Sequence, residues 1–152
     1  MRLENLIKDI EEEMYQKITD NHEIDPEEAR RTAKIVGLSA IKYGDLSNQA
    51  SKDYVFDLDR FTSFEGNTGP YILYTIVRIK SILNKYQDAG GSMDCILIQK
   101  ASNDSEKALM LELGKFNGVM ENAFEEKAPH KVCLIYMIWR MRLIVFTMRR
   151  RF

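Results

Sequence analysis

Two tyrosines and an arginine share one face of a predicted helix in the middle of the chain. Tyr71, Tyr74 and Arg78 follow one another at spacings of three and four residues, which places their side chains on one side of an α-helix. Flat aromatic rings stack on unpaired bases, and a guanidinium pairs with phosphate. The spacing therefore favours an RNA-contacting face. The same stripe is also typical of the buried seam of an ordinary helix, and the three residues alone leave both interpretations open.

Three sequence motifs follow one another in the predicted helix and in the chain before it. The first contains Ile-Lys-Tyr-Gly-Asp-Leu within residues 40–47, and the second contains Phe-Asp-Leu-Asp within residues 53–59. The third, residues 64–78, begins Phe-Glu-Gly-Asn-Thr-Gly-Pro-Tyr and ends at Arg78. In this order and spacing the segments closely resemble arginyl-tRNA synthetase, a class I aminoacyl-tRNA synthetase. The resemblance extends more loosely from the N-terminus to about Cys133.

The resemblance implies how the chain is divided and which residues meet RNA. Residues 1–69 are expected to end the catalytic portion, and residues 70–133 to begin the helical anticodon-binding domain. Tyr71, Tyr74 and Arg78 are then the expected contacts with the anticodon arm of tRNA(Arg), although Tyr71 is equally well explained as a core ring. The turn that sets the direction of this helix is expected to consist of Phe64, Gly66, Asn67 and Pro70. Asn67 is expected to cap the helix, with direct contact to RNA as the alternative.

Periodicity and capping signals predict a mainly α fold, in which a helical segment and a short strand or hairpin lead into the beginning of an anticodon-binding helical bundle. Helices are expected over residues 3–18, from Asp25-Pro26 to Tyr43, over 70–86, and over 109–123 after a cap at Asn103. The alternating residues 54–58 predict a strand, and residues 88–92 a loop. Residues 95–98 fit either a strand or a buried connection. Both histidines, His22 and His130, are expected to be exposed or capping.

The sequence lacks the motifs with which this family carries out catalysis. Class I synthetases use a His-Ile-Gly-His-type signature and often a Lys-Met-Ser-Lys-Ser-type loop, and neither occurs here. No catalytic residue and no metal ligand is therefore predicted. The resemblance implies ATP and Mg²⁺ as the needs of the full-length family enzyme, arginine–tRNA ligase. This chain alone is expected to be inactive.

Composition limits the compartment and the partners. The chain has 152 residues and a formal net charge of −1, so only a local basic patch could serve RNA. Cys95 and Cys133 match no metal spacing and indicate reduced thiols of a cytoplasmic protein. The apolar stretch 134–148 contains Arg140 and Arg142, which makes it a poor membrane span. Neither membrane nor DNA is an expected partner.

The last 19 residues depart from the family pattern, which would continue with an amphipathic helix. A permitted back-translation of residues 134–152, with one G restored before it, gives AYIYDLANAFNRFYHEEKI, which looks like the missing helix. We therefore interpret 134–152 as a frameshifted tail, which resequencing across the codon after Cys133 tests. Its arginine-rich end would then not be a phosphate-binding patch.

The favoured reading is a fragment of arginine–tRNA ligase that keeps a tRNA-facing helix and lacks the nucleotide site. Met1 falls inside the family pattern, so a separately encoded N-terminal piece is a further expected partner. The alternative is a stand-alone, non-catalytic tRNA-binding or helical interaction module.

Overall fold

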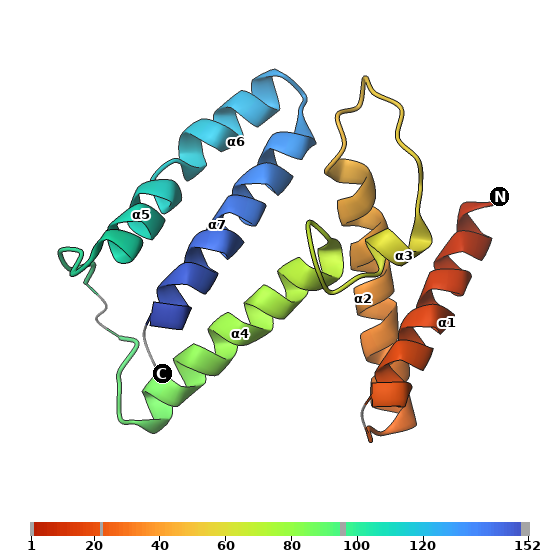
Figure 1. Cartoon of the computed structure of the whole chain (residues 1–152), viewed down its shortest axis with the longest axis horizontal. Coiled ribbons are helices and arrows are strands. Elements are labelled where there is room, and N and C mark those ends of the chain that lie inside the picture. The colour runs from red at the N-terminus through yellow and green to blue at the C-terminus, as the bar shows by residue number, and fades with distance from the viewer. Residues whose placement is uncertain (1, 22, 95–96, 150–152) are drawn as a thin grey trace. The chain divides into compact units, whose positions relative to one another are not determined.

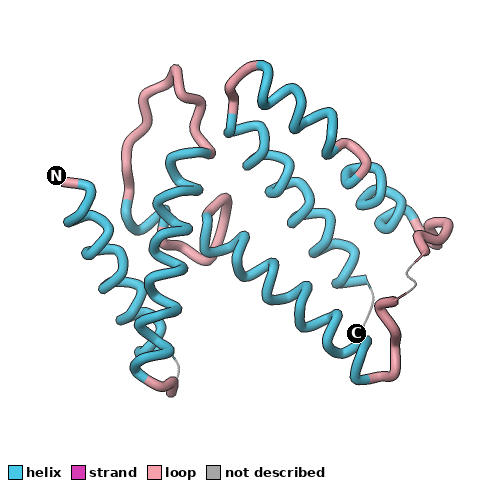
Figure 2. Tube along the Cα trace, turned by 180° about the vertical axis from the view of Figure 1, so that it is seen from behind, coloured by secondary structure: helices cyan, strands magenta, loops and turns pink. Residues whose placement is uncertain are grey.

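The computed structural model describes residues 2–21, 23–94 and 97–149, and it divides the chain into two compact units, Met1–Leu73 and Tyr74–Phe152. Seven α-helices and no strand occur in these described ranges (Figure 2). The mainly helical fold is therefore confirmed. The division after Leu73 lies four residues beyond the boundary expected between residues 69 and 70, which stays a prediction.

The first unit is built on an antiparallel helical hairpin. Helices α1 (Leu3–Asn21) and α2 (Pro26–Leu46) lie side by side (Figure 1). The fully buried Ile10 and Met14 of α1 pack against Ala33 and Val36 of α2. Asp25 accepts hydrogen bonds from the backbone of Glu27 and Glu28, so the predicted cap of α2 is confirmed.

The predicted strand at residues 54–58 is wrong. Residues 54–57 are a loop that leads into the short helix α3 (Leu58–Phe61), and Asp57 caps this helix by accepting a 3.0 Å bond from the Arg60 amide. The described part of the chain offers no second strand with which these residues could pair. Their alternate aromatic rings instead meet one ring of α3: the centroids of Phe56 and Tyr54 lie 4.8 and 6.1 Å from that of Phe61.

Helix α4 (Gly69–Asp88) begins in the first unit and continues into the second. Its predicted range was 70–86. After its last residue the chain turns through Gly90, whose φ of +86° is a left-handed conformation that glycine adopts without strain. The amide of Gly91 then bonds the carbonyl of Tyr86 at 2.9 Å, which ends the helix within the predicted loop 88–92.

The second unit contains three further helices. Helices α5 (Asp104–Leu113) and α6 (Phe116–Glu125) follow one another along one side of α7 (Pro129–Arg149), which runs in the opposite direction (Figure 1). Asn103 caps α5 as predicted. The single helix expected over 109–123 is broken at residues 114 and 115, where Gly114 has low helix propensity and ends α5.

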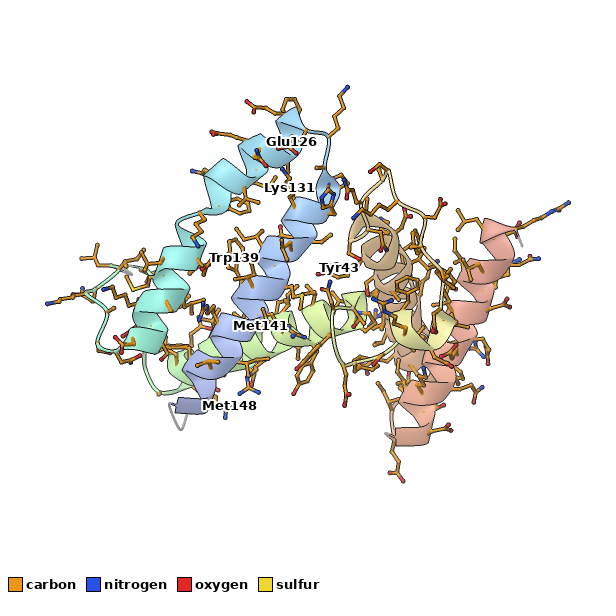
Figure 3. The ribbon with its side chains drawn as sticks, turned by 45° about the horizontal axis from the view of Figure 1, so that its top comes forward. Tyr43, Glu126, Lys131, Trp139, Met141 and Met148 are labelled. Carbon is orange, nitrogen blue, oxygen red and sulfur yellow. The ribbon has the colours of Figure 1, made fainter. Side chains whose placement is uncertain are left out.

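Trp139 holds α5 and α7 together. Its indole Nε1 donates a 3.0 Å bond to the carbonyl of Glu112, in the last turn of α5, and its ring lies 5.5 Å from that of Phe116 (Figure 3). The Glu112 carbonyl also accepts a 3.2 Å bond from the Lys115 amide, so the indole uses the second lone pair of this oxygen. None of the described helices has the length and apolarity needed to cross a membrane.

Some sequence expectations concern residues with little or no description. His22, Cys95 and Ile96 lie outside the described residues, so their predicted roles are left as predictions. Leu97 and Ile98 are exposed, which is wrong for a buried connection. His130 is half-buried near the start of α7, and its Nδ1 has no hydrogen-bond partner among the described residues.

Candidate functional site

The turn before α4 is fastened to helix α2. The hydroxyl of Tyr43 donates a 2.7 Å hydrogen bond to Oδ1 of Asn67, and Figure 3 shows Tyr43 on α2. Gly69 lies directly against the backbone of Ser39, since a Cβ at Gly69 would stand 2.2 Å from the Ser39 carbonyl oxygen. Two of the family-like segments, residues 40–47 and 64–78, are therefore in direct contact.

Thr68 caps α4 in place of the expected Asn67. Its hydroxyl donates to the Ser63 carbonyl at 2.6 Å and accepts from the Tyr71 amide at 3.3 Å. Thr68 is buried, whereas the Asn67 side chain bonds across to Tyr43. The sequence contained a signal for this cap, because threonine two residues before Pro70 is a favoured capping type.

The other predicted turn residues occupy different positions in this loop. Gly66 has a φ of +77° in an exposed bend, a conformation that favours glycine. Pro70 is fully buried at the start of α4, and Phe64 is exposed. These positions are those of a loop that directs α4, and no RNA contact is needed to explain them.

The three predicted tRNA-contacting residues differ in exposure. Tyr71 is half-buried at the end of the first unit. Tyr74 is the most accessible, with 52% of its surface exposed in the second unit. Arg78 is half-buried, and its Nη2 donates a 3.1 Å hydrogen bond to Oγ1 of Thr147 in α7. Tyr74 therefore has the surface that stacking on a base requires, and Arg78 is held inside its own unit.

Ionisable groups elsewhere are perturbed by local contacts. Lys131 bonds the Glu126 carboxylate at 2.6 Å across the turn between α6 and α7, and this contact lowers the pKa of Glu126 (Figure 3). Burial raises the pKa of the Cys133 thiol. Within the described ranges, no group of three or more His, Cys, Asp or Glu side chains is placed to hold a metal ion. The contact between Lys131 and Glu126 therefore ties the end of α6 to the start of α7.

Comparison with known proteins defines the class of the helical region. Residues 72–137 match the DALR anticodon binding domain. This match includes Tyr74 and Arg78 together with α5, α6 and the first part of α7. The region is therefore an anticodon-binding domain of the DALR class.

Whole-chain relatives identify the family. An arginine–tRNA ligase from Agathobacter rectalis is 61% identical over 141 residues, which cover 88% of this chain and 24% of the relative. One from Alkaliphilus oremlandii is 52% identical over 133 residues, with 88% and 22% covered. The chain belongs to the arginyl-tRNA synthetase family, as the sequence predicted. It spans about a quarter of the length of these relatives.

Solved structures agree with this result. Arginyl-tRNA synthetase from Thermus thermophilus matches with a TM-score of 0.76 and 26% identity, over 93% of this chain and 23% of that one. The Plasmodium falciparum enzyme matches in fold with a TM-score of 0.80 at 24% identity, over 98% and 27% of the two chains. The helical fold of this chain therefore also occurs in solved arginyl-tRNA synthetases.

Proposed function

We propose that the second unit binds the anticodon arm of tRNA(Arg), with Tyr74 as the residue that stacks on a base. The observation that carries this proposal is the DALR match over residues 72–137, which contains Tyr74. The exposed ring of Tyr74 supports it, because a ring must present a face to solvent before a base can stack on it. Tyr71, which is half-buried, is a secondary candidate on the same helix.

The attachment of arginine to tRNA requires parts of a synthetase beyond those recognised in this chain. The sequence contains neither class I nucleotide signature. We therefore propose that the chain recognises tRNA in the cytoplasm and does not itself join arginine to it. ATP and Mg²⁺ would serve the nucleotide site of a complete enzyme.

A separately encoded N-terminal piece is the proposed protein partner. Support comes from α2, which exposes Ile35, Leu38 and Leu46 on a helix that also carries family-like residues. Apolar residues exposed along one helix are typical of a surface that another protein segment covers. Co-expression with the part of the Agathobacter rectalis enzyme that precedes the matched region tests this: the pair should co-purify and charge tRNA(Arg), whereas a lack of both would contradict the partner.

Filter binding of labelled tRNA(Arg) tests the RNA proposal. Loss of the ring in Tyr74→Ala should weaken binding by about 1–3 kcal/mol, because stacking of one base on an aromatic ring contributes that amount. Tyr74→Phe keeps the ring and should bind like the parent. Tyr86→Ala is the matched control, since Tyr86 is a similarly exposed tyrosine on another face of α4. Equal binding by Tyr74→Ala and the parent would contradict the stacking role.

A further inference from the structure

The guanidinium of Arg78 is occupied within its own unit by the last turns of α7. Its Nη2 donates to Oγ1 of Thr147 at 3.1 Å, and Thr147 is buried. The Thr147 hydroxyl in turn donates to the Ile144 carbonyl at 3.2 Å, which leaves its lone pairs to accept from Arg78. Thr147 is thus oriented as an acceptor by its own helix.

This contact leaves the charge of Arg78 without an anion. No carboxylate forms an ion pair with Arg78 among the residues that the structure describes, and its Nε is buried there without a hydrogen-bond partner. A hydroxyl is a weaker partner for a guanidinium than a phosphate, because a phosphate adds the attraction of opposite charges and can accept two parallel N–H bonds. Exchange of the hydroxyl for a phosphate oxygen would therefore lower the free energy of this half-buried cation.

We infer that Thr147 masks Arg78 in this chain, and that release of this contact exposes a phosphate-binding arginine one helical turn beyond Tyr74. This inference rests on the proposed binding of tRNA by the second unit. Arg78 follows Tyr74 by four residues, so the two side chains lie on one face of α4. A long arginine side chain can keep its stem packed while its head group turns toward solvent. The last turns of α7 therefore act as an autoinhibitory segment against RNA.

Masking predicts that removing the acceptor improves RNA binding. Thr147→Val keeps the shape of the side chain and removes the oxygen that holds Nη2. Its affinity for tRNA(Arg) at fixed salt should rise about tenfold, the size expected for one charge-assisted contact. The dependence of affinity on salt should also become steeper by about one phosphate contact. Thr147→Ser keeps the acceptor and should bind like the parent.

The double variant separates masking from a general change in α7. If Arg78 mediates the gain, then Arg78→Ala combined with Thr147→Val should bind no better than Arg78→Ala alone. The fluorescence of Trp139 and the circular dichroism of each variant verify that α7 still packs on α5. A variant of Thr147 that fails this check is replaced by Thr147→Ala, which also lacks the hydroxyl.

The possible outcomes distinguish masking of Arg78 by Thr147 from the proposed binding of tRNA. Binding by the parent with an unchanged affinity and salt slope in Thr147→Val would overturn the masking and leave the tRNA proposal in place. A gain that persists without Arg78 would overturn it as well. If parent and variants all fail to bind tRNA(Arg), both the proposed function and the masking are wrong.

Discussion

The hydroxyl of Tyr43 donates a 2.7 Å hydrogen bond to Oδ1 of Asn67, which joins helix α2 to the turn before α4. The bond spans 24 residues of sequence within the first unit, and the contact of Gly69 with the Ser39 backbone lies close to it in the chain. The family-like motifs in residues 40–47 and 64–78 are therefore parts of one packed junction. Packing at the start of α4 therefore accounts for some residues of these motifs without any contact with RNA.

Gly69→Ala should destabilise this junction. A Cβ at position 69 would meet the Ser39 carbonyl oxygen at 2.2 Å, and a backbone atom in the middle of α2 cannot move aside cheaply. Steric conflicts of this kind typically cost about 1–3 kcal/mol. Thermal unfolding followed by circular dichroism measures the change. Gly118→Ala is the control, because a Cβ there meets nothing within 4 Å and alanine favours the helix; an equal effect of both substitutions would contradict the close approach.

Lys127→Gly should stabilise the turn between α6 and α7. Lys127 has a φ of +51°, the left-handed region that costs a side-chain-bearing residue about 1 kcal/mol, and it directly follows the C-cap of α6. Glycine adopts this conformation freely, so the free energy of unfolding should rise by up to about 1 kcal/mol. Lys107→Gly, inside α5, is the matched control and should lower stability. A loss of stability in both variants would count against this turn geometry.

The thiol of Cys133 should react slowly in the folded chain. Burial in α7 raises its pKa, so less reactive thiolate exists at a given pH, and the sulfur is shielded from reagents. The rate of modification by a disulfide reagent, measured in a Cys95→Ser background, should increase strongly in urea. Equal rates in buffer and urea would show that this part of α7 does not pack as described.

Replacing residues 134–152 by AYIYDLANAFNRFYHEEKI should improve solubility and raise the unfolding temperature. In this chain α7 exposes Leu134, Met141, Val145 and Met148, the last with 74% of its surface accessible, and such residues promote aggregation. Lower solubility of the replaced chain would contradict the interpretation of this tail as frameshifted, as would an unbroken frame on resequencing.

Local signals in the sequence predicted the helices and most of their caps. Asp25 and Asn103 cap their helices because short polar side chains reach nearby amides in any context. The strand at 54–58 was not predictable in this way, since a strand needs a distant partner and the alternating rings meet Phe61 instead. The Thr147 contact of Arg78 was equally hidden, because it joins residues 69 positions apart. Helical spacing placed Arg78 on the face of Tyr74 but did not show what else would occupy its guanidinium.

The affinity of the chain for tRNA(Arg), compared with the same tRNA carrying an altered anticodon, tests the central claim most directly. An anticodon-binding domain should bind the unaltered tRNA more tightly, and Tyr74→Ala should reduce this preference while Tyr86→Ala leaves it intact. The measurement is filter binding at one fixed salt concentration, since affinity for RNA depends strongly on salt. Equal affinity for the two tRNAs, or a preference that survives loss of the Tyr74 ring, would contradict the account.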